Sequence, residues 1–424
     1  MTEFLQLRSA EEAWAIFLDS FKPTVTSETL RVAEALDRVL AQDAVAPHRL
    51  PTFVRSTVDG YAVQAADTHG ASAGSPAYLD VVAEVPMGAQ AGLVLGPGQA
   101  ALVHTGGMVP EGSDAVVMLE HTHRAGAPLQ DGQANPGSSF PAFSIEVYRP
   151  AASGENCIQP GEDVQAGELI LPIGRVLRPQ DVGGLLAVGI TEVAVARRPR
   201  ISILSQGDEV VPPEQEPGPG QVRDINSYTL AGLVHRAGGI PLNYPIAPDR
   251  EESLFAAVQA AFDDADLLVV TAGSSVSYRD LTAQAINRLG PPGALVHGVA
   301  VRPGKPTILA VCGGKPVFGL PGNPVSCINI YRRFVEPAIR MLLGAGPLRY
   351  MSVQARLARN IPGASGRADY VRVRLEEREG ETWAVPVFGK SNLIYTLIRS
   401  EGVVEVPLNS NGIPAGTILT VTLD

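Results

Sequence analysis

The strongest constraint on the fold is an alternation of apolar strand, small-residue turn and helix between residues 200 and 345. Ile201–Leu204 and Leu267–Val270 are uninterrupted apolar runs, as expected for strands that are buried on both faces of a parallel sheet. The predicted helices span about residues 226–237, 251–261, 281–289 and 325–343, and a further strand about 316–320. This alternation predicts a doubly wound α/β domain.

The segments on either side of this domain show different patterns. Ser9–Glu12 forms a capping box at the start of a predicted helix that runs to about Ser20. Apolar residues at helical spacing predict a second helix from about residue 27 to 41. Residues 61–147 contain short strands broken by Gly and Pro, which indicates a small β unit. Five short apolar runs after Gly344 predict a small β-barrel or sandwich.

Charge and composition exclude several classes of protein. The 424 residues carry a formal net charge of −11, which disfavours a broad nucleic-acid footprint because such footprints are cationic. No apolar run reaches the roughly 18 residues that a membrane helix needs. The three cysteines have no metal-binding spacing and indicate reduced thiols. We therefore expect a cytoplasmic protein that binds neither nucleic acid nor membrane.

Three loops follow predicted strand ends in the α/β domain. Ser205–Glu209, Thr271–Asp280 and Gly319–Ser326 are rich in small residues, and the third opens a helix. Ligands of open α/β sheets bind at the carboxyl ends of the strands, where small residues let backbone N–H groups approach a phosphate. The three loops together predict an anionic, nucleotide-like ligand.

Acidic residues lie on or beside the same loops: Asp208, Glu209, Asp224, Asp249 and Asp280. Carboxylates repel a phosphate unless a divalent cation lies between them, and Mg²⁺ takes one or two carboxylates together with phosphate oxygens. The pattern therefore predicts a Mg²⁺-dependent step at a phosphate. Each acid has an alternative reading as a helix cap or a solvated loop charge, and Asp224 before the predicted helix is an example.

Cations mark another segment. The chain has 29 Arg but four Lys, and Lys305, Lys315 and Lys390 each follow a glycine. Arg302–Pro306 reads RPGKP and places two cations on a rigid turn, which suits an oxyanion. Asp59, in an Asp-Gly pair, is compatible from the residues alone with an ordinary turn.

Taken together and in order, these motifs resemble the molybdopterin molybdenumtransferase family, which includes the E domain of gephyrin. The resemblance rests on Arg55–Ala62, His104–Gly107, Pro110–Gly112, Ala115–Val117, Pro160–Asp163, Ser205–Glu209, Arg223–Asn226, Thr271–Asp280, Arg302–Pro306 and Gly319–Ser326. It implies a multidomain α/β plus β fold. The expected parts are an elongated N-terminal domain (1–57 and 146–198), an inserted β domain (58–145), an α/β molybdopterin-binding domain (199–345) and a C-terminal β-barrel (346–424).

The resemblance also implies a reaction. Family members insert molybdenum from molybdate into adenylylated molybdopterin and release AMP with the help of Mg²⁺. They act as homodimers, in which the segment around Asp59 of one subunit lies near the α/β cleft of the other. The catalytic residues implied by matching motifs are Asp59, Glu209, Asp249, Asp280 and Lys305, with Asp249 and Asp280 as the Mg²⁺ ligands. The implied contacts to molybdopterin or molybdate are Thr105, Gly106, Gly207, Asp208, Asp224, Asn226, Gly273, Ser274, Ser275, Arg302, Pro303, Gly304, Pro321, Gly322, Asn323 and Pro324.

The sequence departs from the family pattern at several positions. Gln206 stands where many members have Thr, Ala272 and Ser277 replace glycines, and Gly298 stands where a lysine is common. These changes leave open a non-catalytic carrier or scaffold for the cofactor, and molybdate and tungstate are too similar to be separated from sequence. The related adenylyltransferases resemble a lone α/β domain, so the length of this chain disfavours that reaction.

Overall fold

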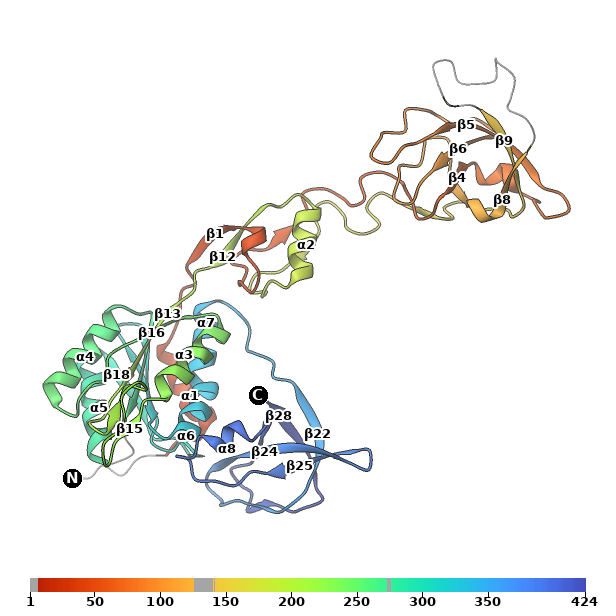
Figure 1. The fold of residues 1–424 in the computed structure, drawn as a ribbon. Coiled ribbons are helices and arrows are strands. Elements are labelled where there is room, and N and C mark those ends of the chain that lie inside the picture. The colour runs from red at the N-terminus through yellow and green to blue at the C-terminus, as the bar shows by residue number, and fades with distance from the viewer. Residues whose placement is uncertain (1–6, 126–139, 141, 273–275) are drawn as a thin grey trace. The chain divides into compact units, whose positions relative to one another are not determined.

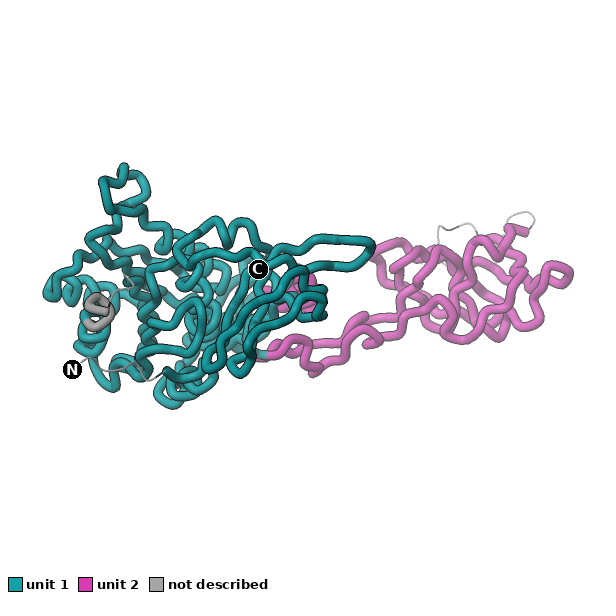
Figure 2. Tube along the Cα trace, turned by 90° about the horizontal axis from the view of Figure 1, so that it is seen from below, with its two compact units in different colours: residues 1–42, 173–179, 192–424 teal, residues 43–172, 180–191 magenta. Residues whose placement is uncertain are grey.

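The computed structural model describes residues 7–125, 140, 142–272 and 276–424, and for residues 276–280 it describes the backbone only. The chain divides into two compact units (Figure 2). Unit 1 comprises residues 1–42, 173–179 and 192–424, and unit 2 comprises residues 43–172 and 180–191.

A six-stranded sheet in the order β16-β13-β17-β21-β20-β18 forms the centre of unit 1 (Figure 1). Neighbours among the first four strands are parallel, whereas β20 pairs antiparallel with both β21 and β18. The strands are β13 (Arg200–Ser205), β16 (Ile240–Asn243), β17 (Leu267–Ala272), β18 (Pro292–His297), β20 (Ile308–Cys312) and β21 (Lys315–Pro321). The predicted α/β fold is confirmed, with an antiparallel edge that the apolar pattern did not reveal.

Helices cover both faces of this sheet (Figure 1). Leu267 and Val269 of β17 belong to the core cluster that contains α1, α3, α6 and α7, while Leu268 and Val270 belong to the cluster that contains α4 and α5. Successive residues of a strand point to opposite faces, so a run that is apolar throughout must be covered on both. The helices are α1 (Ala10–Ser20), α3 (Asn226–Ala237), α4 (Glu251–Asp263), α5 (Val276–Arg288), α6 (Pro324–Ile330) and α7 (Glu336–Leu342).

The long helix predicted for 325–343 is interrupted. A π-helical segment, Tyr331–Val335, separates α6 from α7. Pro337 lies in the first turn of α7 and has no N–H to donate to the preceding turn, so the regular α-helical ladder cannot continue through it.

The C-terminal region forms a closed barrel. Its strands follow the order β24-β25-β22-β28-β26, and a β24–β26 pairing closes the ring. The strands are β22 (Ser352–Leu357), β24 (Ala368–Arg378), β25 (Glu381–Pro386), β26 (Gly402–Val406) and β28 (Ile418–Leu423). Strand β19 (Val301–Arg302) of the α/β region pairs with β24, so the barrel is joined to the start of the RPGKP turn.

The helix predicted for residues 27–41 is wrong. Ser27–Arg31 is strand β1, which pairs antiparallel with β12 (Glu192–Ala196), and Leu30 lies opposite Val193. A single 3₁₀ turn, Val32–Glu34, follows the strand. Pairing with a strand distant in sequence outweighs the local helical spacing of the apolar residues.

Unit 2 is built around a second six-stranded sheet, in the order β7-β4-β6-β5-β9-β8. Its strands are β4 (Gly60–Val63), β5 (Ala77–Glu84), β6 (Gln99–Val103), β7 (Ala115–Met118), β8 (Thr122–Ala125) and β9 (Phe143–Val147). Helix α2 (Pro179–Ala187) has no counterpart in the sequence-based prediction. Among the described helices, none has the length and apolar character to cross a membrane.

Candidate active site

The carboxyl ends of β13 and β17 carry a buried chain of polar groups. Ser227 Oγ donates to Asp224 Oδ2 at 2.5 Å, and Ser205 Oγ lies 2.8 Å from Ser227 Oγ and 3.2 Å from Thr271 Oγ1. Asp224 Oδ1 also accepts from the Ser227 N–H at the start of α3. The predicted ligand residue Asp224 therefore stabilises the end of a helix and the strand edge from a buried position.

Asp208 and Asp249 form a reciprocal pair beside this edge. Asp249 Oδ2 accepts from the Asp208 N–H at 3.1 Å, and Asp208 Oδ1 accepts from the Asp249 N–H at 3.2 Å. Asp249 Oδ1 also accepts from Gln206 Nε2 at 3.0 Å, while Thr282 Oγ1 donates to Gln206 Oε1 at 2.9 Å. Gln206, a departure from the family pattern, thus orients the Asp249 carboxylate.

Glu209 lies over the same turn. A Cβ atom at Gly207 would come within 2.5 Å of Glu209 Oε2, and Gly207 has φ +144°, a conformation that favours glycine. The predicted residues Gly207, Asp208, Glu209 and Asp249 are therefore neighbours in one loop cluster.

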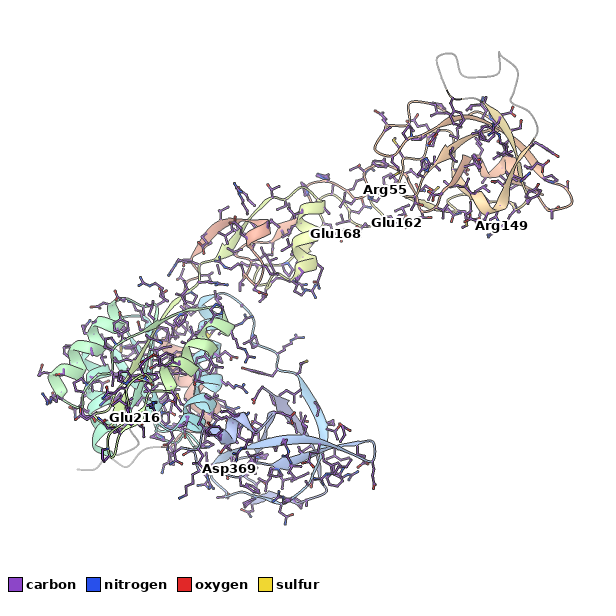
Figure 3. All side chains as sticks on the ribbon, in the orientation of Figure 1. Arg55, Arg149, Glu162, Glu168, Glu216 and Asp369 are labelled. Atoms are coloured by element: carbon purple, nitrogen blue, oxygen red, sulfur yellow. The ribbon has the colours of Figure 1, made fainter. Side chains whose placement is uncertain are left out.

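A cavity of about 1530 Å³ lies between the α/β region and the barrel, within unit 1. Among the described residues that line the cavity, six are Lys or Arg and one, Asp369, is acidic. Figure 3 labels Asp369, which lies on β24 of the barrel. The cationic lining residues are Arg8, Arg302, Lys305, Arg367, Arg372 and Lys390.

The cations differ in how far they are already neutralised. Arg367 Nε lies 3.0 Å from Asp369 Oδ1, whereas the mostly exposed Arg302 side chain reaches Asp369 Oδ2 only at 4.0 Å. The side chains of Lys305 and Lys390 make no ion pair or hydrogen bond among the described residues. These two ammonium groups are available to an anion that enters the cavity.

The RPGKP turn is held from two sides. Thr307 Oγ1 donates to the Gly304 carbonyl at 2.6 Å, and Asn329 Nδ2 donates to the Pro303 carbonyl at 2.7 Å. Gly304 has φ +130°, and a Cβ atom there would lie 2.5 Å from Ile330 Cδ1. The turn therefore needs glycine both for its backbone conformation and for its close packing.

The loop at the end of β21 is hydrogen-bonded both to the α/β strand edge and to the barrel region. The Gly322 N–H donates to the Ala272 carbonyl at 2.7 Å, and Asn226 Nδ2 donates to the Gly322 carbonyl at 2.7 Å. Asn323 precedes α6, and its Nδ2 donates to Ser391 Oγ of the barrel region at 3.0 Å. Pro324, the first residue of α6, is buried. Pro321 and Asn323 line the cavity.

A separate group of predicted residues lies in unit 2. The Thr105 N–H donates to Asp59 Oδ1 at 2.8 Å, and Thr105 Oγ1 lies 3.3 Å from the same oxygen. Gly106 adopts φ +83°, which completes the tight turn. Gly60 is required because a Cβ atom there would come within 2.1 Å of the Val117 carbonyl oxygen.

The remaining predicted residues cannot be placed in this geometry. Gly273, Ser274 and Ser275 lie outside the described residues. Asp280 belongs to helix α5, but its side chain is outside the description. Within the described part of the chain, no three His, Cys, Asp or Glu side chains gather as a metal site.

The barrel's contribution to the cavity was not predicted from the sequence. Arg367, Asp369, Ser391 and Asn392 line it, and none belongs to a motif singled out from the α/β pattern. Lys390 was noted from sequence as a lysine that follows a glycine in a chain with few lysines, but no ligand role was predicted for it. None of the three cysteines, all of which are described, lines the cavity. Burial raises the pKa of the Cys157 thiol to about 11 and also raises that of Cys327.

The chain matches known proteins over almost its whole length. Three family models fit in succession: the MoeA N-terminal region (domain I and II) at residues 8–189, a probable molybdopterin binding domain at 202–341, and the MoeA C-terminal region (domain IV) at 354–423. A Bacillus subtilis molybdopterin molybdenumtransferase is 32% identical, over 95% of this chain and 91% of its own. The chain belongs to the molybdopterin molybdenumtransferase family.

Other relatives agree with this assignment to the molybdopterin molybdenumtransferases. Molybdopterin molybdenumtransferase 2 of Mycobacterium tuberculosis is 31% identical, over 93% of this chain and 94% of its own. The solved molybdopterin biosynthesis moeA protein of Pyrococcus horikoshii superposes with a TM-score of 0.83 at 32% identity, covering 99% of this chain and 100% of its own. The order of motifs that suggested this family from sequence therefore corresponds to the order of its domains.

Proposed function

We propose that the protein is a transferase that moves molybdenum from molybdate onto adenylylated molybdopterin and releases AMP. Membership of the molybdopterin molybdenumtransferase family supports the reaction class. The observation that carries the proposal is the cation-lined cavity, in which Arg302, Lys305 and Lys390 face the open space while Asp369 is already engaged by Arg367. Such a cavity attracts a doubly charged oxyanion or a phosphate.

The RPGKP turn would hold the anion. Arg302 offers a planar set of donors and Lys305 a compact charge, and the packing around Gly304 fixes the turn that carries both. Ser391 and Asn323, which are hydrogen-bonded to each other, add neutral donors at the rim. The backbone of the turn and the Asn323–Ser391 pair are fixed before substrate arrives, which lowers the reorganisation needed to stabilise charge.

Mg²⁺ fits the donor set at the neighbouring edge. The Asp208 and Asp249 carboxylates are hard oxygen ligands, and each oxygen that accepts one hydrogen bond keeps a second lone pair. Mg²⁺ takes one or two carboxylates and completes its shell with phosphate and water. We propose Asp249 and Asp280 as the protein ligands. When bound, Mg²⁺ would neutralise charge on the phosphoanhydride.

The remaining predicted residues complete the proposal. Glu209 and Asp59 are proposed as catalytic carboxylates, and the other predicted contacts as binding groups of the α/β loops and the Thr105 turn. We further propose a homodimer in which the Asp59 turn of one subunit serves the α/β site of the other. The domain boundaries given from sequence are part of the same proposal. Three free cysteines support a reducing, cytoplasmic setting.

The product of the reaction provides the test. The purified protein should, with adenylylated molybdopterin and molybdate, activate a cofactor-free molybdenum enzyme. Lys305→Ala should abolish most of this activation, and Lys315→Ala should not. Activation equal to that of a mixture without the protein would contradict the transferase and support a carrier. AMP release measured with tungstate in place of molybdate shows which oxyanion the site prefers.

A further inference from the structure

His104 lies between two carboxylates in the sheet of unit 2. The register explains why: Gly60 of β4 pairs with Val103 of β6, and Glu84 of β5 pairs with Leu102. The residue after β6 is therefore flanked by the end of β5 on one side and by Asp59, just before β4, on the other. Neither His104 nor Glu84 is among the residues assigned above to the reaction.

The imidazole is oriented by Glu84, the nearer of its two carboxylate partners. His104 Nε2 lies 2.9 Å from Glu84 Oε1, a hydrogen-bonding distance. This contact turns the other ring nitrogen toward Asp59, with Nδ1 3.9 Å from Asp59 Oδ1. A protonated ring can donate toward both carboxylates, whereas a neutral ring presents an unprotonated nitrogen to one of them. The charged groups that face the imidazole are Glu84 from β5 and Asp59 from the turn before β4.

The two oxygens of Asp59 are unequal. Oδ1 accepts from the Thr105 N–H and is the oxygen that faces the imidazole. Oδ2 has no partner among the described residues. The side chain is 59% exposed, so Oδ2 is open to a ligand.

We propose that His104 is a positioning residue that holds Asp59 with Oδ2 directed toward the substrate, and that Glu84 orients the His104 ring. This inference rests on the proposed function, because it assigns a role to His104 in the same reaction. His104 acts through Asp59 and does not touch the substrate. Since the three side chains are half-exposed, the imidazole contributes orientation more than charge.

Kinetics of AMP release from adenylylated molybdopterin test this role. His104→Gln and Glu84→Gln should each lower kcat by roughly 5- to 20-fold while KM stays within about twofold. His123→Gln is the matched control, because His123 lies opposite Glu146 in the same sheet and is also exposed. It should leave kcat unchanged, and melting temperatures should show that all three variants are folded.

Chemical rescue separates positioning from a structural effect. His104→Ala should regain activity when free imidazole is added, whereas a variant that is merely distorted should not. If the wild-type protein releases AMP and His104→Gln has the same kcat as His123→Gln, the role of His104 is contradicted and the proposed function stands. If wild-type protein releases no AMP, the proposed function fails and the role of His104 fails with it.

Discussion

Asp59 and Thr105 are 46 positions apart in the chain, yet the Thr105 N–H donates to Asp59 Oδ1 at 2.8 Å. Pairing of β4 with β6 brings the turns that precede and follow these strands together. Two residues predicted from separate motifs therefore form a single acidic turn. This contact holds one carboxylate oxygen and leaves the other for chemistry.

Asp59→Asn removes the charge of this turn and leaves its hydrogen bond in place, because the amide oxygen can still accept from Thr105. We expect turnover to fall by about 10²-fold or more with the melting temperature nearly unchanged, since a carboxylate that acts in the transition state affects rate more than stability. Steady-state AMP release and a thermal melt check this. Near-normal turnover of Asp59→Asn would show that the Asp59 carboxylate has no catalytic role.

Lys305→Ala should weaken anion binding in the cavity. Its ammonium group is exposed and is not paired among the described residues, so its loss costs binding and little stability. We expect the rate at limiting molybdate to fall by about 10²-fold. Kinetics over a range of molybdate concentrations measure it.

Lys315→Ala is the control for this lysine. Lys315 also follows a glycine, but its Nζ donates to the Phe262 carbonyl at 3.0 Å and lies 4.8 Å from the Phe262 ring centroid. Its loss should cost about 1 kcal/mol of stability and leave turnover intact. Equal kinetic effects at the two positions would show that the cavity is not the anion site.

Gly304→Ala tests the rigidity of the RPGKP turn. The new Cβ would lie 2.5 Å from Ile330 Cδ1, and φ +130° is strained for alanine. We expect a loss of roughly 1–3 kcal/mol in unfolding free energy and a rise in KM for molybdate, because Lys305 follows directly. Chemical denaturation and kinetics measure the two effects. A variant as stable as the wild type would contradict the packing described here.

Glu336 makes stability depend on pH. Burial raises the pKa of its carboxyl, although the Tyr350 hydroxyl and neighbouring arginines oppose the rise. The folded state therefore holds the proton more tightly, so this stabilisation is full below the unfolded pKa and is lost as pH rises through the folded pKa. Glu336→Gln should melt at a higher temperature than the wild type at pH 7.5 and show little difference near pH 4. A lower melting temperature at pH 7.5 would contradict this.

Sequence patterns predicted those parts of the fold in which local signals and tertiary packing agree. The capping box at Ser9 starts α1, and the apolar run at 267–270 lies within β17. The helix predicted from residue 27 was wrong because this segment is a strand whose partner lies at 192–196. No local sequence pattern indicates a pairing over that separation. The same limit hid the antiparallel edge formed by β20 and β18.

Residues of the candidate site could be predicted only where they belong to a sequence motif. The RPGKP turn was found because two cations and a glycine are adjacent in sequence. Arg367 and Ser391 reach the same cavity from the barrel, and their proximity arises from the β19–β24 pairing and the Asn323–Ser391 hydrogen bond. A contact that exists only after two regions dock leaves no signal in either segment alone.

AMP release from adenylylated molybdopterin, measured with and without molybdate and Mg²⁺, tests the central claim most directly. We expect release that requires both, with Asp59→Asn and Lys305→Ala strongly impaired. Tight binding of the nucleotide without any release under any of these conditions would contradict it.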